Sequence, residues 1–148
     1  MASHRYPGSR PGHTVHVTNS EATDFCLTLS SDSDAAGVAR TFVDEHSDAL
    51  PQDLVEDAKL LVTELVTNAV RHGQPEITLR VSLYPPLMGV SVQDEGAAVP
   101  STEIRPPDLE SPGGRGLMIV DRMSSSWGVV PAEPPPGKVV WFRLDSVT

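Results

Sequence analysis

The chain has 148 residues, a length that suits one domain with a sizeable core. Its formal net charge of −9 argues against a nucleic-acid backbone or an anionic membrane as the main partner, because both bind through clustered Lys and Arg. Cys26 is the only cysteine, which excludes a disulfide framework and favours a reducing compartment. Since no apolar run is long enough for a membrane span or a signal segment, we expect a cytoplasmic protein.

The N-terminal residues 1–20 carry Pro, Gly, Ser and His with little apolar content. Burial of so few apolar groups cannot offset the entropy lost on ordering. We therefore predict a disordered tail over 1–20 and one folded domain over 21–148. His4, His13 and His16 in this tail could form a metal-binding tract, but their irregular spacing favours the unstructured interpretation.

The next segment predicts a strand followed by a helix. Apolar residues alternate over 25–29, which is the period of a half-buried strand. A helix then begins after a cap at Ser33 or Asp34 and runs to about His46. The residues expected on its inner side are apolar: Val38, Phe42 and Val43.

A long amphipathic helix is predicted from about Pro51 to Gly73, because acidic residues follow the proline and the glycine is a typical stop. Its apolar residues fall on one arc of a helical wheel: Leu54, Ala58, Leu61, Val62, Leu65, Val66 and Ala69. Glu64 and Asn68 are four residues apart beside this arc, so they stack one turn above the other at the margin of the core. An ordinary solvated i,i+4 pair explains the same spacing, so other motifs must decide.

Four strands and a short helix are predicted in the second half of the chain. The strands form two hairpins: 77–83 with 88–93, and 127–130 with 139–144. Residues 94–116 lack periodicity and contain several prolines, so this long loop is a lid candidate, and a buried helix follows over 117–123. Together the elements predict an α/β fold: a two-layer sandwich whose mixed, mostly antiparallel sheet carries three helices on one face.

Two short glycine motifs flank the predicted loop. Asp94 follows a strand and is followed by Glu95 and Gly96, a pattern that on its own is common in turns. The glycines within 113–116 precede a helix start, where backbone N–H donors and the helix dipole can hold an anion such as phosphate. Arg115 among them could pair with phosphate oxygens, although a flexible linker explains the glycines as well.

The order of three motifs resembles the N box and the two glycine boxes of the GHKL ATP-binding superfamily of gyrases and histidine kinases. The motifs are Glu64-X-X-X-Asn68, Asp94-X-Gly96 and Gly114-X-Gly116. Within this superfamily the run 64–73 looks most like the anti-sigma-factor serine kinases of bacterial partner-switching systems. The similarity extends over about residues 24–144, and Ala98 stands where the first glycine box often has a second glycine.

The resemblance implies a role for each motif. Asn68 would ligate a Mg²⁺ ion that bridges the ATP phosphates, and Glu64 would be the catalytic base that accepts the proton of an attacking serine hydroxyl. Asp94 would accept a hydrogen bond from the adenine amino group, and Gly96 would let the ring approach. The phosphates would be held by the second glycine motif and the helix start: Gly114, Arg115, Gly116 and Leu117.

The function implied by this resemblance is an ATP-dependent serine protein kinase that acts as an anti-sigma factor. It would bind a sigma factor and phosphorylate an anti-sigma-factor antagonist, regulating transcription without direct contact with nucleic acid; a homodimer is one assembly open to it. A second possibility is a non-catalytic module of the same fold that sequesters a protein, with or without nucleotide. A weaker third is an ATPase subunit that works by conformational cycling. Glu64 favours the kinase, because a pure binding module needs no carboxylate at the base position.

Overall fold

The sheet and its helices are formed by the residues that the computed structural model describes: 2–4, 14–18, 22–71, 76–95, 114–133 and 136–145. The helices are α1 (Ala35–Glu45), α2 (Gln52–Arg71) and α4 (Gly114–Met123). The strands are β1 (Ala2–His4), β2 (Thr14–Thr18), β3 (Ala22–Ser30), β4 (Glu76–Tyr84), β5 (Leu87–Asp94), β6 (Ser126–Pro131) and β7 (Lys138–Asp145).

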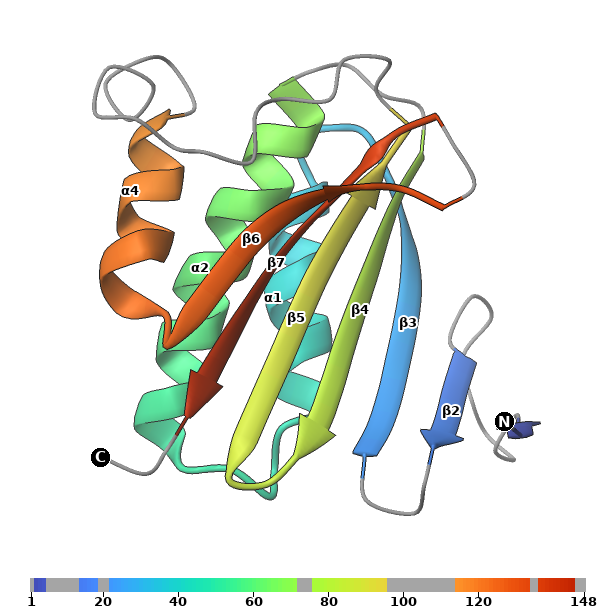
Figure 1. Ribbon diagram of the computed structural model, residues 1–148, viewed down its shortest axis with the longest axis vertical. Coiled ribbons are helices and arrows are strands. Elements are labelled where there is room, and N and C mark those ends of the chain that lie inside the picture. Colours follow the sequence, from blue (N-terminus) through green and yellow to red (C-terminus); the bar gives the residue numbers. More distant parts are fainter. Residues whose placement is uncertain are drawn as a thin grey trace.

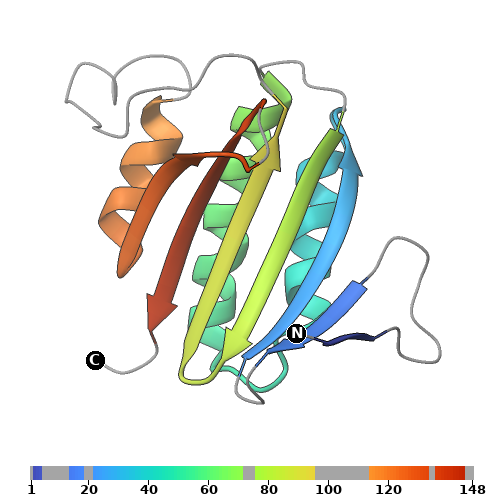
Figure 2. The same ribbon diagram turned by 45° about the vertical axis from the view of Figure 1, so that its right-hand side comes forward.

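The strands form one seven-stranded sheet in the order β1-β2-β3-β4-β5-β7-β6. The three helices lie together on one face of it, and the other face is open (Figures 1 and 2). This arrangement confirms the predicted α/β sandwich with three helices on one face. All pairings among the described strands are antiparallel, so the parallel part of a mixed sheet is not found among them.

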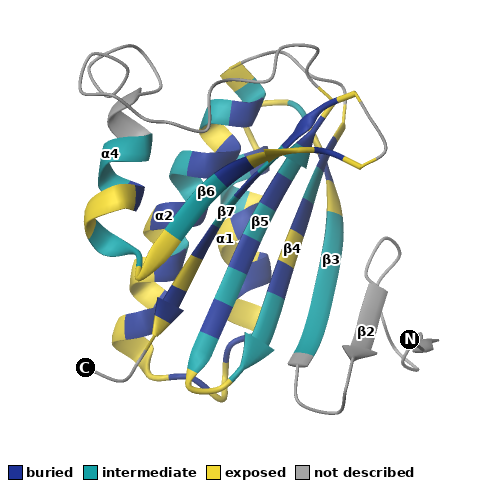
Figure 3. Cartoon of the chain, viewed as in Figure 1, coloured by how far each residue is buried: buried dark blue, intermediate teal, exposed yellow. Residues whose placement is uncertain are grey.

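Helix α2 supplies most of the helical contribution to the core. Every residue of its predicted apolar arc is buried, which confirms the predicted inner face of the helix: Leu54, Ala58, Leu61, Val62, Leu65, Val66 and Ala69. Figure 3 shows the matching alternation of buried and less buried residues along β5 and β7. Because burial of one Leu or Val side chain contributes about 1.5–3 kcal/mol, this face fixes the position of α2 on the sheet.

Helix α1 packs beside α2 through a face that the sequence predicts only in part. Phe42 and Val43 are buried as expected, but Val38 is 46% exposed, so its inner placement is wrong. The small residues Ala35 and Ala39 are buried in its place, and their short side chains allow α1 to approach its neighbours closely. Asp34 is the N-cap residue, one of the two that were expected.

Strands β1 and β2 fall inside the segment 1–20, for which the sequence predicts a disordered tail. They extend the sheet by backbone pairing, β1 on β2 and β2 on β3, which the low apolar content of the segment does not signal. The rest of that segment lies outside the described residues, as do 96–113 of the expected lid and Gly73. None of the described helices is long and apolar enough to cross a membrane.

Candidate functional site

Glu64 and Asn68 lie on the last two turns of α2, at the margin of the buried arc. Both residues are half-buried, while Leu65 and Ala69 next to them are buried. Neither side chain makes a hydrogen bond or ion pair with another described residue. The structure therefore places this carboxylate and this amide where the helical spacing predicts, one turn apart at the edge of the core.

Asp94 is the last residue of β5, and it is only 2% exposed. Its side chain lies on the same face of the sheet as Val90 and Val92, the face that the helices cover, because strand residues two apart share a face. Lys138, the first residue of β7, is paired directly opposite Asp94 and is 6% exposed. The Lys138 ammonium donates to Oδ2 of Asp94 at 2.8 Å. Pairing offsets part of the cost of removing both charges from water, and loss of either partner would leave a buried charge uncompensated.

Sequence reasoning places Asp94 at a strand end but misses Lys138. The ion pair depends on the register between β5 and β7, strands that are far apart in the chain, and that register is not visible in the sequence. The one available signal is a lysine at the start of an apolar strand, directly after Gly137. A lysine at that place more often marks an exposed strand end, because Lys is seldom fully buried.

Gly137 brings the chain into close contact with the backbone of Asp94. Its φ is +118°, a conformation that side-chain-bearing residues rarely adopt. A Cβ atom at this position would lie 2.2 Å from the Asp94 carbonyl oxygen. The carbonyl of Gly137 also accepts a hydrogen bond from the N–H of Ala132 at 3.0 Å. Glycine is therefore required for the β6–β7 connection to approach the end of β5.

The predicted site residues come from elements that meet at one end of the molecule. Figures 1 and 2 both show the C-terminal ends of α2 and β5, the N-terminal end of α4 and the start of β7 at this end. Helix α2 also packs against α4. Glu64, Asn68 and Asp94 are thereby brought to the same end as the α4 N-terminus, where free backbone N–H groups favour an anion.

The second glycine motif forms the first turn of α4. Gly114, Arg115 and Gly116 are helical, and Leu117, which follows them, is half-buried. The predicted helix is therefore present, but it begins at Gly114, three residues earlier than expected, so the glycines lie inside its first turn and do not precede it. The prediction that 117–123 is buried is wrong except at Val120, because the other residues of this range are half-buried or exposed. Gly96 and Ala98 of the first glycine motif lie outside the described residues.

The residues present are compatible with a Mg²⁺ ion held together with a nucleotide. Within the described part of the chain, no group of three or more His, Cys, Asp or Glu could hold a metal by itself. Asn68 offers one amide oxygen, and Mg²⁺ typically takes only one or two protein ligands beside substrate phosphates and waters. Among the described residues, Asn68 therefore fits the role of a single protein ligand to a metal held together with a nucleotide.

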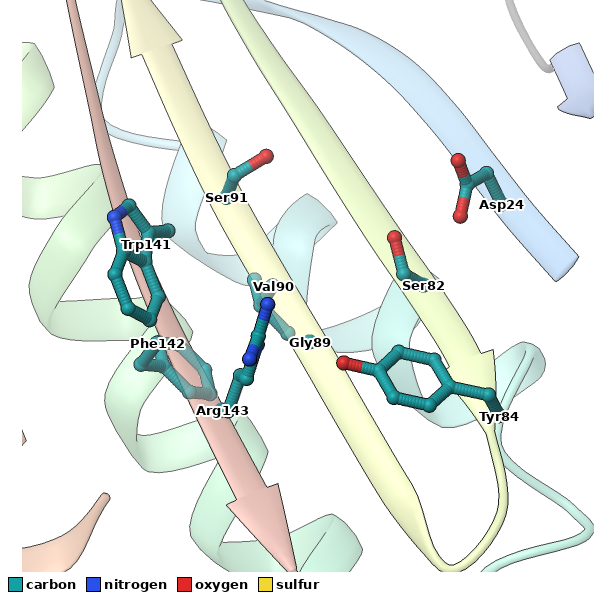
Figure 4. Close-up of a pocket in the computed structure, with 9 residues that line it drawn as sticks. All are labelled: Asp24, Ser82, Tyr84, Gly89, Val90, Ser91, Trp141, Phe142 and Arg143. Atoms are coloured by element: carbon teal, nitrogen blue, oxygen red, sulfur yellow. The ribbon is translucent and has the colours of Figure 1, made fainter. Parts of the chain in front are cut away.

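A hollow of about 290 Å³ with a mixed polar and apolar lining lies on the open face of the sheet, opposite the helices (Figure 4). Gly89 forms part of its floor, and the Arg143 guanidinium lies 5.6 Å from the centre of the Trp141 ring at one side. Its other lining residues come from β3, β4, β5 and β7: Asp24, Ser82, Tyr84, Val90, Ser91 and Phe142. None of the predicted site residues lines it, so it is separate from the candidate nucleotide site.

A comparison with known families identifies the type of domain that carries Glu64, Asn68 and Asp94. The family model of the histidine kinase-like ATPase domain matches residues 29–144, which include Glu64, Asn68 and Asp94. No characterised protein compared with the chain is a significant match. Domains of this family in general bind ATP with Mg²⁺. The match covers well over half of the chain, so the protein belongs to the family of histidine kinase-like ATPase domains.

Proposed function

We propose that the protein is an ATP-dependent serine protein kinase that acts as an anti-sigma factor in a partner-switching system. It phosphorylates an anti-sigma-factor antagonist and, in the other state of the switch, holds a sigma factor. Family membership supports the ATP-dependent part. The observation that supports phosphoryl transfer most directly is the placement of Glu64 and Asn68. They stand one turn apart on α2, at the end of the molecule that also carries Asp94 and the α4 N-terminus.

The proposed chemistry assigns one task to each group. The N-terminus of α4 would hold the phosphates, and Asn68 would be a ligand of the Mg²⁺ whose charge neutralises them. The serine hydroxyl oxygen of the antagonist attacks the γ-phosphorus, the bond to the bridging oxygen breaks, and ADP leaves. Glu64 accepts the proton of that hydroxyl. A half-buried carboxylate without a partner among the described residues is a suitable acceptor.

The proposed partners are proteins. A chain with a net charge of −9 attracts basic protein surfaces over long distances and repels nucleic acid. The surface around α1 and the sheet edge is the proposed contact with the sigma factor, because it leaves the nucleotide end accessible to the antagonist. In this proposal the protein works in the cytoplasm and needs no membrane.

The proposal is tested by capture followed by phosphosite mapping. The full chain is immobilised and incubated with an extract of its own cells, with Mg·ATP or with Mg·ADP, and captured proteins are mapped for phosphoserine. The kinase proposal expects a captured small protein that carries phosphoserine only with ATP. Stable capture of a partner that is never phosphorylated would contradict it and would identify a sequestering module.

A further inference from the structure

Lys138 carries hydrogen-bonding capacity that the ion pair with Asp94 does not use. An ammonium group has three N–H donors. Lys138 is 6% exposed, and Asp94 is its one hydrogen-bond partner among the described residues. Buried donors are almost always satisfied by protein, water or ligand, because leaving one unsatisfied costs free energy. The two remaining N–H groups therefore point to a further acceptor at this site.

The position of Lys138 places these donors beside the group expected to bind the base. Lys138 and Asp94 are directly paired across β5 and β7, and both side chains lie on the helix-covered face. Their charged atoms are 2.8 Å apart, so a donor and an acceptor stand side by side. A flat heteroaromatic edge with one donor next to one acceptor would match them both.

Adenine has a donor next to an acceptor on one edge, and guanine has the two in the opposite order on the same edge. Adenine has an amino donor at position 6 and an unprotonated nitrogen acceptor at N1, whereas guanine has a carbonyl acceptor at position 6 and an N–H donor at N1. If Asp94 faces position 6 and Lys138 faces N1, adenine satisfies both residues. Guanine in the same orientation would set an acceptor against Asp94 and a donor against Lys138, and both contacts would be repulsive.

We infer that Lys138 is a second base-recognition residue that donates a hydrogen bond to N1 of adenine, while Asp94 accepts one from the 6-amino group. The inference rests on the proposed binding of ATP and goes beyond it by naming which atoms of the base are recognised. Selectivity for ATP over GTP then depends on two residues, and the lysine contributes through contact with the base as well as through its pairing with Asp94.

The wild-type protein tests this contact by means of base analogues. 1-Deaza-ATP keeps the amino group but has C–H in place of N1, so it removes only the acceptor for Lys138. Calorimetric titration with Mg²⁺ should give an affinity for 1-deaza-ATP at least about tenfold below that for ATP, because a buried donor loses its partner. 7-Deaza-ATP, altered on the other ring, is the matched control and should bind like ATP.

Two variants of Lys138 assign the effect to this residue. Lys138→Met should bind ATP and 1-deaza-ATP with equal affinity, and Lys138→Arg, which keeps a cationic donor, should restore part of the preference. Lys59→Met removes one positive charge from an exposed pair with Glu56 and Asp44, and it should keep the full wild-type preference. If Lys138→Met instead weakened the binding of ATP and of 1-deaza-ATP by the same factor, the wild-type preference for ATP would be kept. Lys138 would then be a purely structural partner of Asp94, and the inference would be wrong.

The outcomes separate this inference from the proposed function. Equal affinity of the wild-type protein for ATP and 1-deaza-ATP would overturn the contact to N1 and leave ATP binding intact. No measurable binding of ATP, 1-deaza-ATP or 7-deaza-ATP would overturn the proposed function and the contact together. The analogue comparison needs only the wild-type chain, so it decides the question even if Lys138→Met does not fold.

Discussion

The ammonium of Lys138 lies 2.8 Å from Oδ2 of Asp94, across the β5–β7 pairing and almost fully out of contact with solvent. The carboxylate expected to recognise adenine is therefore part of the core as well as part of the site. Charges in such a place are stable only while both partners are present. Folding stability and the proposed base recognition would consequently depend on the same two side chains.

We expect Lys138→Met to lower the free energy of unfolding by about 3–5 kcal/mol, because it leaves the buried carboxylate without its cation. Urea denaturation followed by circular dichroism measures this loss. The double variant Asp94→Val/Lys138→Met should recover much of it, since an apolar pair leaves no buried charge. Lys59→Met is the charge control and should change stability little, because the Lys59 pair with Glu56 is exposed to solvent. Equal stability of wild type and Lys138→Met would contradict the dependence of the buried Asp94 carboxylate on this cation.

Gly137→Ala should destabilise the protein by about 1–3 kcal/mol and weaken ATP binding. The positive φ is strained for alanine, and the new methyl group would collide with the Asp94 carbonyl oxygen, which must shift together with its side chain. Thermal unfolding and ATP titration measure the two effects. Gly37→Ala in α1 is the matched control, because its Cβ would be only in ordinary contact at 3.5 Å. It should stabilise the helix by about 0.5–1 kcal/mol without changing ATP affinity. A Gly137→Ala variant that binds ATP normally would show that the approach of this glycine does not position Asp94.

Asp94→Asn should lower the affinity for ATP by about tenfold to a hundredfold, since the amide offers one acceptor oxygen where the carboxylate offers two. The affinity for GTP, which we expect to be weak in the wild type, should fall by a smaller factor than the affinity for ATP. The preference for ATP over GTP should therefore decrease. Parallel calorimetric titrations of wild type and variant with ATP and GTP measure this. Equal affinity of the wild-type protein for both nucleotides would remove the adenine assignment of Asp94.

Glu64→Ala should still capture its protein partner, because partner binding is proposed at the surface around α1 and the sheet edge, whereas transfer needs the nucleotide end. Circular dichroism first verifies that the variant is folded. A pull-down then measures how much of the protein partner it still captures. A folded Glu64→Ala protein that loses the partner together with transfer would contradict the separation of sequestration from catalysis.

The sequence predicts those parts of the fold that local periodicity controls. The buried arc of α2 and the four strands from β4 to β7 follow from helical and alternating patterns, and the position of Asp94 at a strand end follows from the second of these. Features that depend on contacts between distant segments are missed. Val38 is exposed because alanines take its place against the neighbouring elements, and β1 and β2 form through backbone pairing.

The site shows the same division. Glu64 and Asn68 are one helical turn apart in α2, and because this spacing depends on one helix alone, the sequence predicts it. The partner of Asp94 is set by the register of β5 and β7, two strands between which α4 and β6 lie in the chain. No local pattern specifies that register, so Lys138 could be identified only from the structure.

The most direct test of the account is the transfer of radiolabelled phosphate from ATP to the captured antagonist by wild type and Glu64→Gln. Glutamine keeps the shape of the side chain but cannot accept the proton of the serine hydroxyl. We expect unchanged ATP affinity and a transfer rate about 10²- to 10⁴-fold lower for Glu64→Gln. Asn68→Ala, run beside it, should instead weaken binding of Mg·ATP, because the phosphates lose an oriented cation. Transfer by Glu64→Gln at the wild-type rate would contradict the assignment of Glu64 as the base.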